Sequence, residues 1–456
     1  MSKKSKTKKS QAEIFAFDAP APKRGKKPGK VKKADLPPLS EWYRLDNAAK
    51  IYPATSHQDW NSTFRVSATL KEEIRPELLS QAVRDLAPRF PTFFVKLRIG
   101  FFWYYFEPAY STDIVSEETT YPCRPIPIFG SEKPVFRVLY YKNRVSVEIF
   151  HAITDGSGAL TFLKALVTRY LTLRGVDTSD ARWSIPDMRD IPSPAETEDS
   201  FAKYYQNLPR VSRKEPRAYT YKGRNSQEEP FLRLISGTFS VEALKKLTRE
   251  KGVTITQYLT ALYILAFARH ISWPARLRPV RISVPVNLRR MFPSQTLRNF
   301  SLFVNVGMQV TPDLTLDDIL AVIVPQLEAG IQRDSILRVF SQNVRAERQL
   351  ALRLTPLFIK NVFLQISFHR FGESRYTSTF SNLGRVELPP SVAEHVESFG
   401  FSLGGSRLNG IGATGISFGD RMTVCFSSTS PDNSIQADFF RMLAQNGLEV
   451  EVESNV

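Results

Sequence analysis

The sequence is poor in cysteine and histidine, which narrows the chemistry available to it. Only Cys123 and Cys425 occur among 456 residues, so we expect two reduced thiols and no disulfide-stabilised fold. The five histidines are scattered, and no pair has the spacing of metal ligands on a helix. We therefore predict no metal site and no bound cofactor.

Long apolar runs are also missing. No uninterrupted run reaches the length of about 18 residues that a transmembrane helix needs, and the basic N-terminus lacks the apolar core of a signal peptide. We expect a cytoplasmic protein. Apolar residues still make up 42% of the chain, which suffices for a large core. A length of 456 residues predicts two domains of roughly 200 residues each.

Acidic residues are outnumbered, but the positive charge is concentrated at one end. Residues 1–33 hold 12 Lys or Arg and two acids, a net +10, which leaves +7 of the total +17 for the rest. This composition is typical of a disordered, solvated tail. The tail lacks a nucleic-acid-binding motif, so we expect no nucleic-acid partner. A weak contact with a membrane surface or another anionic partner stays open.

Residues 34–184 are predicted to form an N-terminal lobe. Alternating residues predict a strand over 63–70, and an apolar stripe predicts a helix from 75 to about 87. Aromatic-rich strands are expected between 93 and 106, followed by a hairpin over 135–150.

Residues 185–230 are rich in proline, serine and charge, which is typical of a crossover linker. The predicted C-terminal lobe, residues 231–456, then repeats the alternation of strands and helices. Strands are expected at 232–239, 281–286, 302–310, 376–383 and 422–428, and helices at 241–251, 256–270, 315–332 and 335–350. This order indicates two similar α/β lobes.

The segment Phe150-His151-Ala152-Ile153-Thr154-Asp155-Gly156 carries the clearest chemical signal. A strand-like run places His151 at its end, and an apolar-striped helix follows Gly156. Histidine readily takes a proton near neutral pH, Asp155 can brace the loop, and Gly156 permits a tight turn. The residues alone fit equally well a histidine that ends a strand and an aspartate that caps a helix.

This H-x-x-x-D-G pattern resembles the active-site motif of the chloramphenicol acetyltransferase-like superfamily. Its members include alcohol acetyltransferases, plant acyl-CoA-dependent acyltransferases, wax ester synthases and the condensation domains of peptide synthetases. Further segments resemble the family in the same order: Arg89-Phe90-Pro91, Ser283 to Arg289 with Leu297 to Asn305, and Ser381-Asn382-Leu383-Gly384. Phe150 replaces the second histidine of condensation domains, and the Asp-Phe-Gly-Trp-Gly signature of plant enzymes is absent. Bacterial or fungal alcohol acetyltransferases are therefore the nearest branch.

The resemblance implies layered α/β lobes that form a pseudo-dimer within one chain, around a central tunnel. It implies that His151 is a general base, which activates a hydroxyl or amine acceptor toward acyl-CoA as co-substrate. The acyl group is expected to be acetyl or short. Asp155 then has a structural role in a bidentate pair with Arg289, for which Arg290 is the competing candidate.

The resemblance also implies substrate-binding residues from the second half of the chain. Ser381, Asn382 and Asn299 are expected there, with Ser381 and Asn382 as possible hydrogen-bond donors to the oxyanion or thioester. Arg298 is a candidate contact for the CoA phosphates.

Two alternatives stay open at this point. One is a non-catalytic binding or scaffold protein with two lobes. The other is a condensation-type or lipid acyltransferase that uses a carrier protein or a long acyl-CoA. In each case we expect the site to form within a single chain, and hence a monomer.

Removal of the basic tail should leave the folded body intact, because residues 1–33 hold too little apolar surface to pack on it. A chain that starts near Lys33 is expected to keep its melting temperature and its turnover, measured by differential scanning fluorimetry and an acyl-transfer assay. A large loss of either would show that the tail docks on the body.

Overall fold

The computed structural model describes residues 42–56, 62–183, 185–209, 215–221, 231–272, 277–405 and 409–455. The predicted tail, residues 1–33, lies outside them. No helix among the described residues is long and apolar enough to cross a membrane. The same residues contain no cluster of three His, Cys, Asp or Glu side chains that could hold a metal ion.

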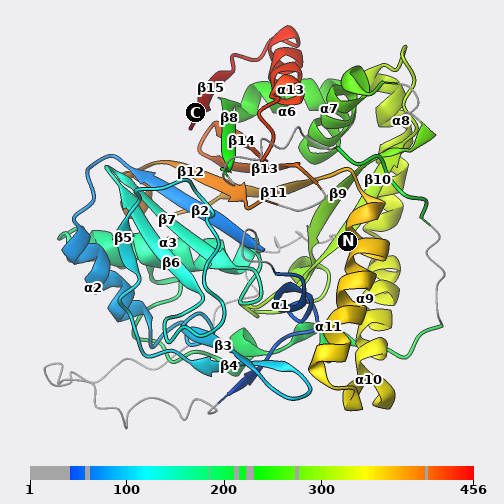
Figure 1. The fold of residues 1–456 in the computed structure, drawn as a ribbon. Helices are drawn as coiled ribbons and strands as arrows, with labels where there is room; N and C mark the ends of the chain where they lie inside the picture. Colours follow the sequence, from blue (N-terminus) through cyan, green and yellow to red (C-terminus); the bar gives the residue numbers. More distant parts are fainter. Residues whose placement is uncertain are drawn as a thin grey trace, which may run out of the picture. The chain divides into compact units, whose positions relative to one another are not determined.

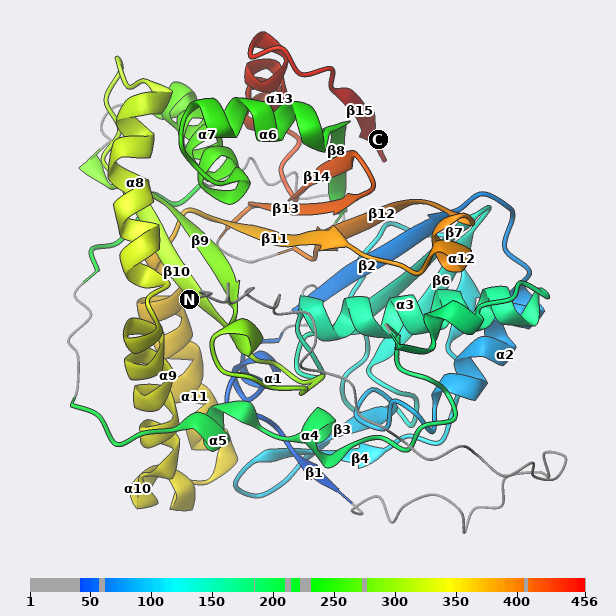
Figure 2. The same cartoon turned by 180° about the vertical axis from the view of Figure 1, so that it is seen from behind.

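One sheet has five strands in the order β12-β2-β7-β6-β5. Their bounds are Val396–Leu403, Thr63–Leu70, Arg144–Phe150, Phe136–Tyr141 and Val115–Glu117. Helices α2 (Pro76–Leu86) and α3 (Gly156–Leu173) lie together on one face of it (Figures 1 and 2). The predicted strand at 63–70, helix after 75 and hairpin over 135–150 are confirmed. The apolar stripe of α2 is buried, which is why this face of the sheet is covered.

The other large sheet has seven strands in the order β10-β9-β11-β13-β14-β8-β15. Their bounds are Ser301–Met308, Val280–Asn287, Ser378–Val386, Ile411–Phe418, Arg421–Ser428, Arg233–Ser240 and Glu451–Ser454. Helices α6 (Val241–Glu250), α7 (Ile255–His270), α8 (Leu316–Gly330) and α13 (Ser434–Gln445) pack against it. All residues from Gln257 to Ala268 are buried, because α7 is covered on every side.

The remaining described elements are a third, small sheet, further helices and short turns. Strands β1 (Tyr43–Arg44), β4 (Tyr104–Pro108) and β3 (Val95–Ile99) form a small sheet. The helices are α1 (Ile51–Thr55), α4 (Pro194–Thr197), α5 (Ser200–Tyr204), α9 (Arg333–Arg348), α10 (Leu350–Leu354), α11 (Leu357–Ser367) and α12 (Pro390–Ala393). Short 3₁₀ or π turns are η1 (Ser179–Trp183), η3 (Leu288–Arg290), η4 (Phe368–Gly372) and η5 (Glu373–Arg375).

One strand from the second half of the chain belongs to the sheet of the first half. Strand β12 comes from the second half but pairs with β2 of the first sheet, with Phe399 opposite Ala68. The chain leaves the second sheet after β11, adds β12 to the first sheet and returns as β13 (Figure 1). The predicted C-terminal lobe, residues 231–456, therefore does not keep all of its strands. The free edge of β2 supplies the backbone partners for β12, and no local pattern of side chains specifies that pairing.

The predicted crossover also contacts both halves. Arg89, from the Arg-Phe-Pro triplet after α2, forms a two-pronged ion pair with Glu196 of α4. The carbonyl of Glu196 in turn accepts a hydrogen bond from the Leu297 backbone at 2.8 Å. The described part of the linker thus helps to hold Leu297 near the first lobe.

Candidate active site

His151 is the first residue after β7, and the neighbouring strand fixes its backbone. Its N–H donates to the carbonyl of Ser62 at 2.8 Å. The imidazole stacks on Tyr52 of α1 with ring centroids 4.6 Å apart, and lies 4.8 Å from the Phe64 ring. Burial among these rings lowers the pKa of His151 below the ordinary 6.5. The imidazole is therefore neutral near pH 7 and able to accept a proton.

Asn299, from the second half of the chain, sets the tautomer of His151. Its Oδ1 lies 3.1 Å from Nδ1 of His151, while Nδ2 donates to Oδ2 of Asp46 at 3.2 Å and to the Ala152 carbonyl at 3.5 Å. Because both of these partners are acceptors, the amide orientation is defined and Oδ1 faces the imidazole as an acceptor. With Oδ1 of Asn299 as acceptor, Nδ1 of His151 carries the proton and Nε2 has the lone pair. Asn299 was expected to bind substrate, but its side chain is engaged in positioning His151.

Asp46 is the residue that the sequence reasoning missed. Its side chain is fully buried, and burial raises its pKa to about 6, opposed by Arg298, whose Nε lies 3.7 Å away. Its Oδ1 accepts from the Ala49 backbone at 2.7 Å, within the turn that precedes α1. This local pattern suggests only a turn, so the contact with Asn299 could not be inferred from it.

Asp155 joins the two halves of the chain next to His151. Its Oδ1 caps α3 by accepting from the Gly158 backbone at 3.1 Å. Its Oδ2 accepts from the Phe300 backbone and from Nη1 of Arg289, each at 2.8 Å. The predicted contact with Arg289 is therefore present, while Arg290 is exposed. The helix-cap interpretation is also correct, because one carboxylate performs both functions.

The pair differs from its prediction in one respect, since Arg289 contacts only one oxygen of the carboxylate. Its Nε and Nη2 instead donate to the carbonyls of Thr296 and Arg298, at 3.0 and 2.6 Å.

The expectation that Arg298 contacts CoA phosphates is wrong. Its guanidinium is buried and donates to the carbonyls of Arg44 and Thr197. The segment from 296 to 300 is thus tied to the His151 loop by its backbone.

Gly156 is required for a reason other than the predicted tight turn. It is the first residue of α3, and its φ is not among the positive values. A β-carbon at this position would lie 2.6 Å from Cδ2 of Leu383 on β11. A β-carbon on Gly158 would lie 2.1 Å from Oγ1 of Thr154 and 2.3 Å from the Leu297 carbonyl. Glycine allows the start of α3 to approach the second half of the chain.

The Ser381-Asn382-Leu383-Gly384 segment forms an irregularity in β11. The register with β13 shifts between Asn382 and Arg385, and Gly384 has a φ of +75°. Oδ1 of Asn382 accepts from the Gly384 backbone at 2.9 Å, and its Nδ2 donates to Oγ1 of Thr256 at 3.1 Å. The Asn382 amide is therefore occupied within the second lobe, which disfavours its expected role as an oxyanion donor. The substrate-binding role of Ser381 stays a prediction.

A small polar cavity of about 60 Å³ lies close to these strands. Its lining includes Tyr376, Thr379, Asn409, Ser427 and Thr429, together with several glycines. Among the described residues, the buried Oγ of Ser427 has no hydrogen-bond partner, whereas the buried Asn409 amide interacts with the Tyr376 hydroxyl in the same lining. Unpaired buried polar atoms are costly, so the cavity suits a polar guest.

The polar cavity lies near the His151 end of the first sheet. Its lining residue Gly404 donates to the Thr63 carbonyl at 2.8 Å, and Thr63 is paired with Phe150. The cavity and the imidazole therefore share a neighbourhood formed by both halves of the chain.

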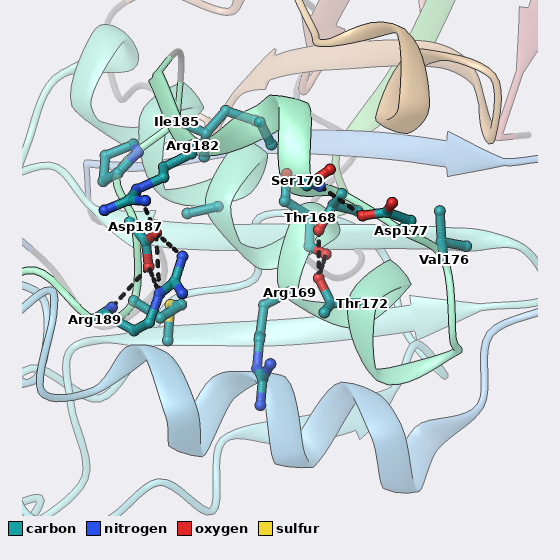
Figure 3. A pocket seen from close by; sticks show the side chains of 15 residues that line it. Thr168, Arg169, Thr172, Val176, Asp177, Ser179, Arg182, Ile185, Asp187 and Arg189 are labelled. Carbon is teal, nitrogen blue, oxygen red and sulfur yellow. Dashed lines mark hydrogen bonds and ion pairs between the residues drawn. The ribbon is translucent and has the colours of Figure 1, made fainter. Parts of the chain in front are cut away.

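A larger cavity of about 390 Å³ lies elsewhere on the first lobe (Figure 3). The second half of α3 and residues from the segments 176–182 and 185–189 line it. Asp187 forms ion pairs there with Arg189 at 2.6 Å and Arg182 at 3.9 Å, and the Arg189 contact lowers the pKa of Asp187 to about 2. Thr168 on its wall lies about 18 Å along α3 from Gly156, given a rise of about 1.5 Å per residue. This cavity is separate from the surroundings of His151.

No protein-family model and no curated protein matches the sequence. Solved structures do share its fold. Polyketide synthase associated protein 5 from Mycobacterium tuberculosis has a TM-score of 0.60 at 12% identity, over 88% of this chain and 96% of that one. The TRI101 protein of F. sporotrichioides, complexed with Coenzyme A and T-2, has a TM-score of 0.60 at 12% identity, over 90% and 100%.

The first condensation domain of the calcium-dependent antibiotic synthetase is similar to the same degree. Its TM-score is 0.59 at 13% identity, over 90% of this chain and 99% of that one. At these identities the likeness establishes the fold and not the activity. The predicted class, two layered lobes of helices and sheets, is confirmed.

A double-mutant cycle tests the link between the lobes. Asp155→Asn and Arg289→Ala should each destabilise the protein by about 3 kcal/mol, because each leaves a buried polar partner unpaired. The double variant should be less destabilised than the sum of both. Urea unfolding measures these values. The exposed pair Arg421 and Glu451 is the matched control, with an expected coupling below about 1 kcal/mol. Additive effects at Asp155 and Arg289 would contradict the link.

The close approach at Gly158 makes a steric prediction. Gly158→Ala should destabilise the protein by about 1–3 kcal/mol, because the added methyl group overlaps Thr154 and the Leu297 carbonyl. Gly372→Ala is the control, since the nearest atom would lie at an ordinary 3.5 Å. Thermal unfolding of both variants checks this, and equal melting temperatures would show that the junction has room.

Proposed function

We propose that the protein is an acyltransferase that moves an acyl group from acyl-CoA to the hydroxyl or amine of a small acceptor. The observation that carries the proposal is the contact of His151 Nδ1 with Asn299, itself held by the buried Asp46, which leaves a neutral imidazole with its lone pair on Nε2. The F. sporotrichioides protein of the same fold was solved with Coenzyme A and T-2, which supports a CoA thioester as donor. The condensation domain of the antibiotic synthetase shares the fold as well.

The proposed reaction needs only the thioester, the acceptor and His151. Nε2 removes the acceptor proton while the acceptor oxygen or nitrogen attacks the thioester carbonyl carbon. The carbonyl electrons move to its oxygen and form a tetrahedral oxyanion. Collapse of this intermediate breaks the carbon–sulfur bond, and the imidazolium returns its proton to the departing thiolate. The products are an ester or amide and a free thiol, with His151 regenerated.

The polar cavity provides a place for a polar group of the acceptor. Ser427 offers a hydroxyl that has no partner among the described residues, and Asn409 offers an amide beside the Tyr376 hydroxyl. A volume of about 60 Å³ accommodates a hydroxyl or carbonyl group and not a whole substrate. In this proposal the reacting group of the acceptor lies at His151 while a second polar group occupies the cavity.

Replacement of His151 tests the proposal directly. His151→Ala should remain folded and lose about 10²- to 10⁴-fold in acyl transfer, the usual effect of removing a general base. Thiol release is measured with acyl-CoAs of several chain lengths and a panel of alcohols, amines and sugars. His395→Ala is the control.

Cys123 and Cys425 are buried, and burial raises the pKa of Cys425 to about 11, so background reaction with the thiol reagent should be low.

The outcomes of this assay are distinct. Full activity in purified His151→Ala would eliminate the general-base mechanism. The absence of activity in the wild type across the whole panel would favour a non-catalytic binding protein. A preference for long acyl chains or carrier-bound acyl groups would show that the donor is not a short acyl-CoA.

The pH profile tests how His151 is held. Its neutral form is the active base, and burial lowers its pKa, so the acid limb of kcat/KM should lie below pH 6.5. The hydrogen bond to Asn299 raises this pKa, so Asn299→Leu should move the limb to still lower pH. Turnover should also fall about tenfold, the factor equivalent to about 1.4 kcal/mol, as the tautomer is no longer fixed. An unshifted limb would show that Asn299 does not govern the imidazole.

A further inference from the structure

Helices α10 and α11 present apolar side chains to solvent. The side chains of Leu350, Leu354, Phe358, Val362, Phe363 and Ile366 are each between 51% and 70% exposed. On α11, the four-residue spacing of Phe358, Val362 and Ile366 places them on one side of the helix, and Leu350 and Leu354 share a side of α10 in the same way. Scattered exposed apolar residues are normal on a protein, but a stripe of six such residues within positions 350–366 indicates an interaction surface.

The turn between β3 and β4 extends this stripe. Ile99, Phe101 and Phe102 are also exposed. The Leu357 backbone donates to the Phe101 carbonyl at 2.8 Å, and Nζ of Lys360 donates to the Phe102 carbonyl at 2.8 Å. These bonds join the turn to α11. We call the combined surface the α10–α11 face, consisting of Ile99, Phe101, Phe102, Leu350, Leu354, Phe358, Ile359, Val362, Phe363 and Ile366.

The other side of α11 is firmly attached to the protein. Leu357 and Lys360 are buried, and Nε2 of Gln365 donates to the Ala54 carbonyl of α1 at 2.8 Å. Lys360 also lies over the Trp103 ring at 3.6 Å. The helix therefore already has its intramolecular partners, and its outward apolar residues are available to another body.

Charge identifies the kind of partner. From 348 to 370 the sequence contains four basic residues, Arg348, Arg353, Lys360 and Arg370, and no acid. Arg353 and Arg370 are exposed. The nearest preceding acid, Glu347, is paired with Lys50. Apolar residues flanked by basic ones are typical of segments that lie in the surface of an anionic bilayer. In a symmetric dimer the same basic flanks would face each other and repel.

We infer that the α10–α11 face docks on an anionic lipid surface. Its phenyl and aliphatic side chains would enter the boundary between headgroups and acyl chains, while Arg353 and Arg370 contact the lipid phosphates. This inference does not depend on the proposed acyl transfer. It assigns membrane contact to the folded body, in addition to any contact by the basic tail.

Vesicle binding by the full chain tests the inference. The protein should co-sediment with vesicles of phosphatidylcholine and phosphatidylserine, and less with phosphatidylcholine alone. Phe358→Ser with Phe363→Ser should weaken binding by at least tenfold, given the apolar area withdrawn from the bilayer. Ile191→Ser with Val452→Ser removes two exposed apolar residues elsewhere and should not change binding. Arg353→Glu with Arg370→Glu should weaken binding only to the anionic vesicles.

Site-specific fluorescence tests the same contact by a second measurement. Both native cysteines are buried, so Val362→Cys can be labelled alone with a polarity-sensitive dye. Its emission should shift to the blue on addition of anionic vesicles, and spin-labelled lipids should quench it. Ile191→Cys is the matched control and should show neither effect.

Three results would overturn the inference. The first is vesicle binding that persists in Phe358→Ser with Phe363→Ser and disappears only when residues 1–33 are removed. The second is a label at position 362 that stays in water when vesicles bind. The third is a dimer in solution that the same double variant dissociates, without binding to vesicles, which would assign the face to self-association.

Discussion

A single buried carboxylate, that of Asp155, orders the region on which any chemistry of this protein depends. It accepts the first-turn N–H of α3, the backbone N–H of Phe300 and one N–H of Arg289. These three donors come from two parts of the chain about 140 residues apart. A buried charge is stable only when such donors surround it, so the start of α3 and the segment near Phe300 must adopt one relative position. The loop that carries His151 lies between them.

The orientation of His151 follows from that position. Asn299 precedes Phe300, so the backbone bond from Phe300 to Asp155 also places the Asn299 amide against the imidazole. Asp46 then fixes the amide from the opposite side. Asp155 therefore holds Phe300, the neighbouring Asn299 is placed with it, and Asn299 in turn orients His151. A change at Asp155 can therefore affect the base without touching it, and the pH profile separates this indirect effect from the loss of the base itself.

The sequence predicts much of this arrangement, because several of its signals are local. Apolar periodicity identifies α2, α3 and α6, and a continuous apolar run identifies α7. The position of Asp155 and Gly156 directly before an apolar-striped helix marks them as residues at a helix start. The contact between Asp155 and Arg289 is predicted from the family resemblance. Asp46 is not predicted, because its local role is only to accept a backbone N–H within a turn. In β12, Phe399, Phe401 and Leu403 alternate as in a strand, but this pattern does not show that the partner is β2 of the first sheet.

Two residues, Arg298 and Asn382, make side-chain contacts other than those predicted for them. Arg298 has the charge expected of a phosphate ligand, yet two carbonyls and Asp46 surround it. The Asn382 amide is used to close the bulge of β11. A residue type indicates which bonds a side chain can form, whereas the fold decides which partners reach it first. For arginine and asparagine, with many possible partners, the sequence is least informative.

The short helix α1 connects the two surfaces to which we assign functions. Its Tyr52 stacks on His151, and its Ala54 carbonyl accepts the hydrogen bond from Gln365 of α11. Helices α1 and α11 therefore lie between the imidazole and the α10–α11 face. A substrate with an apolar chain would be concentrated at a docked lipid surface, whereas a fully water-soluble acceptor would gain nothing from docking. The position of α1 thus links the proposed reaction to the inferred surface through one property of the acceptor, its polarity.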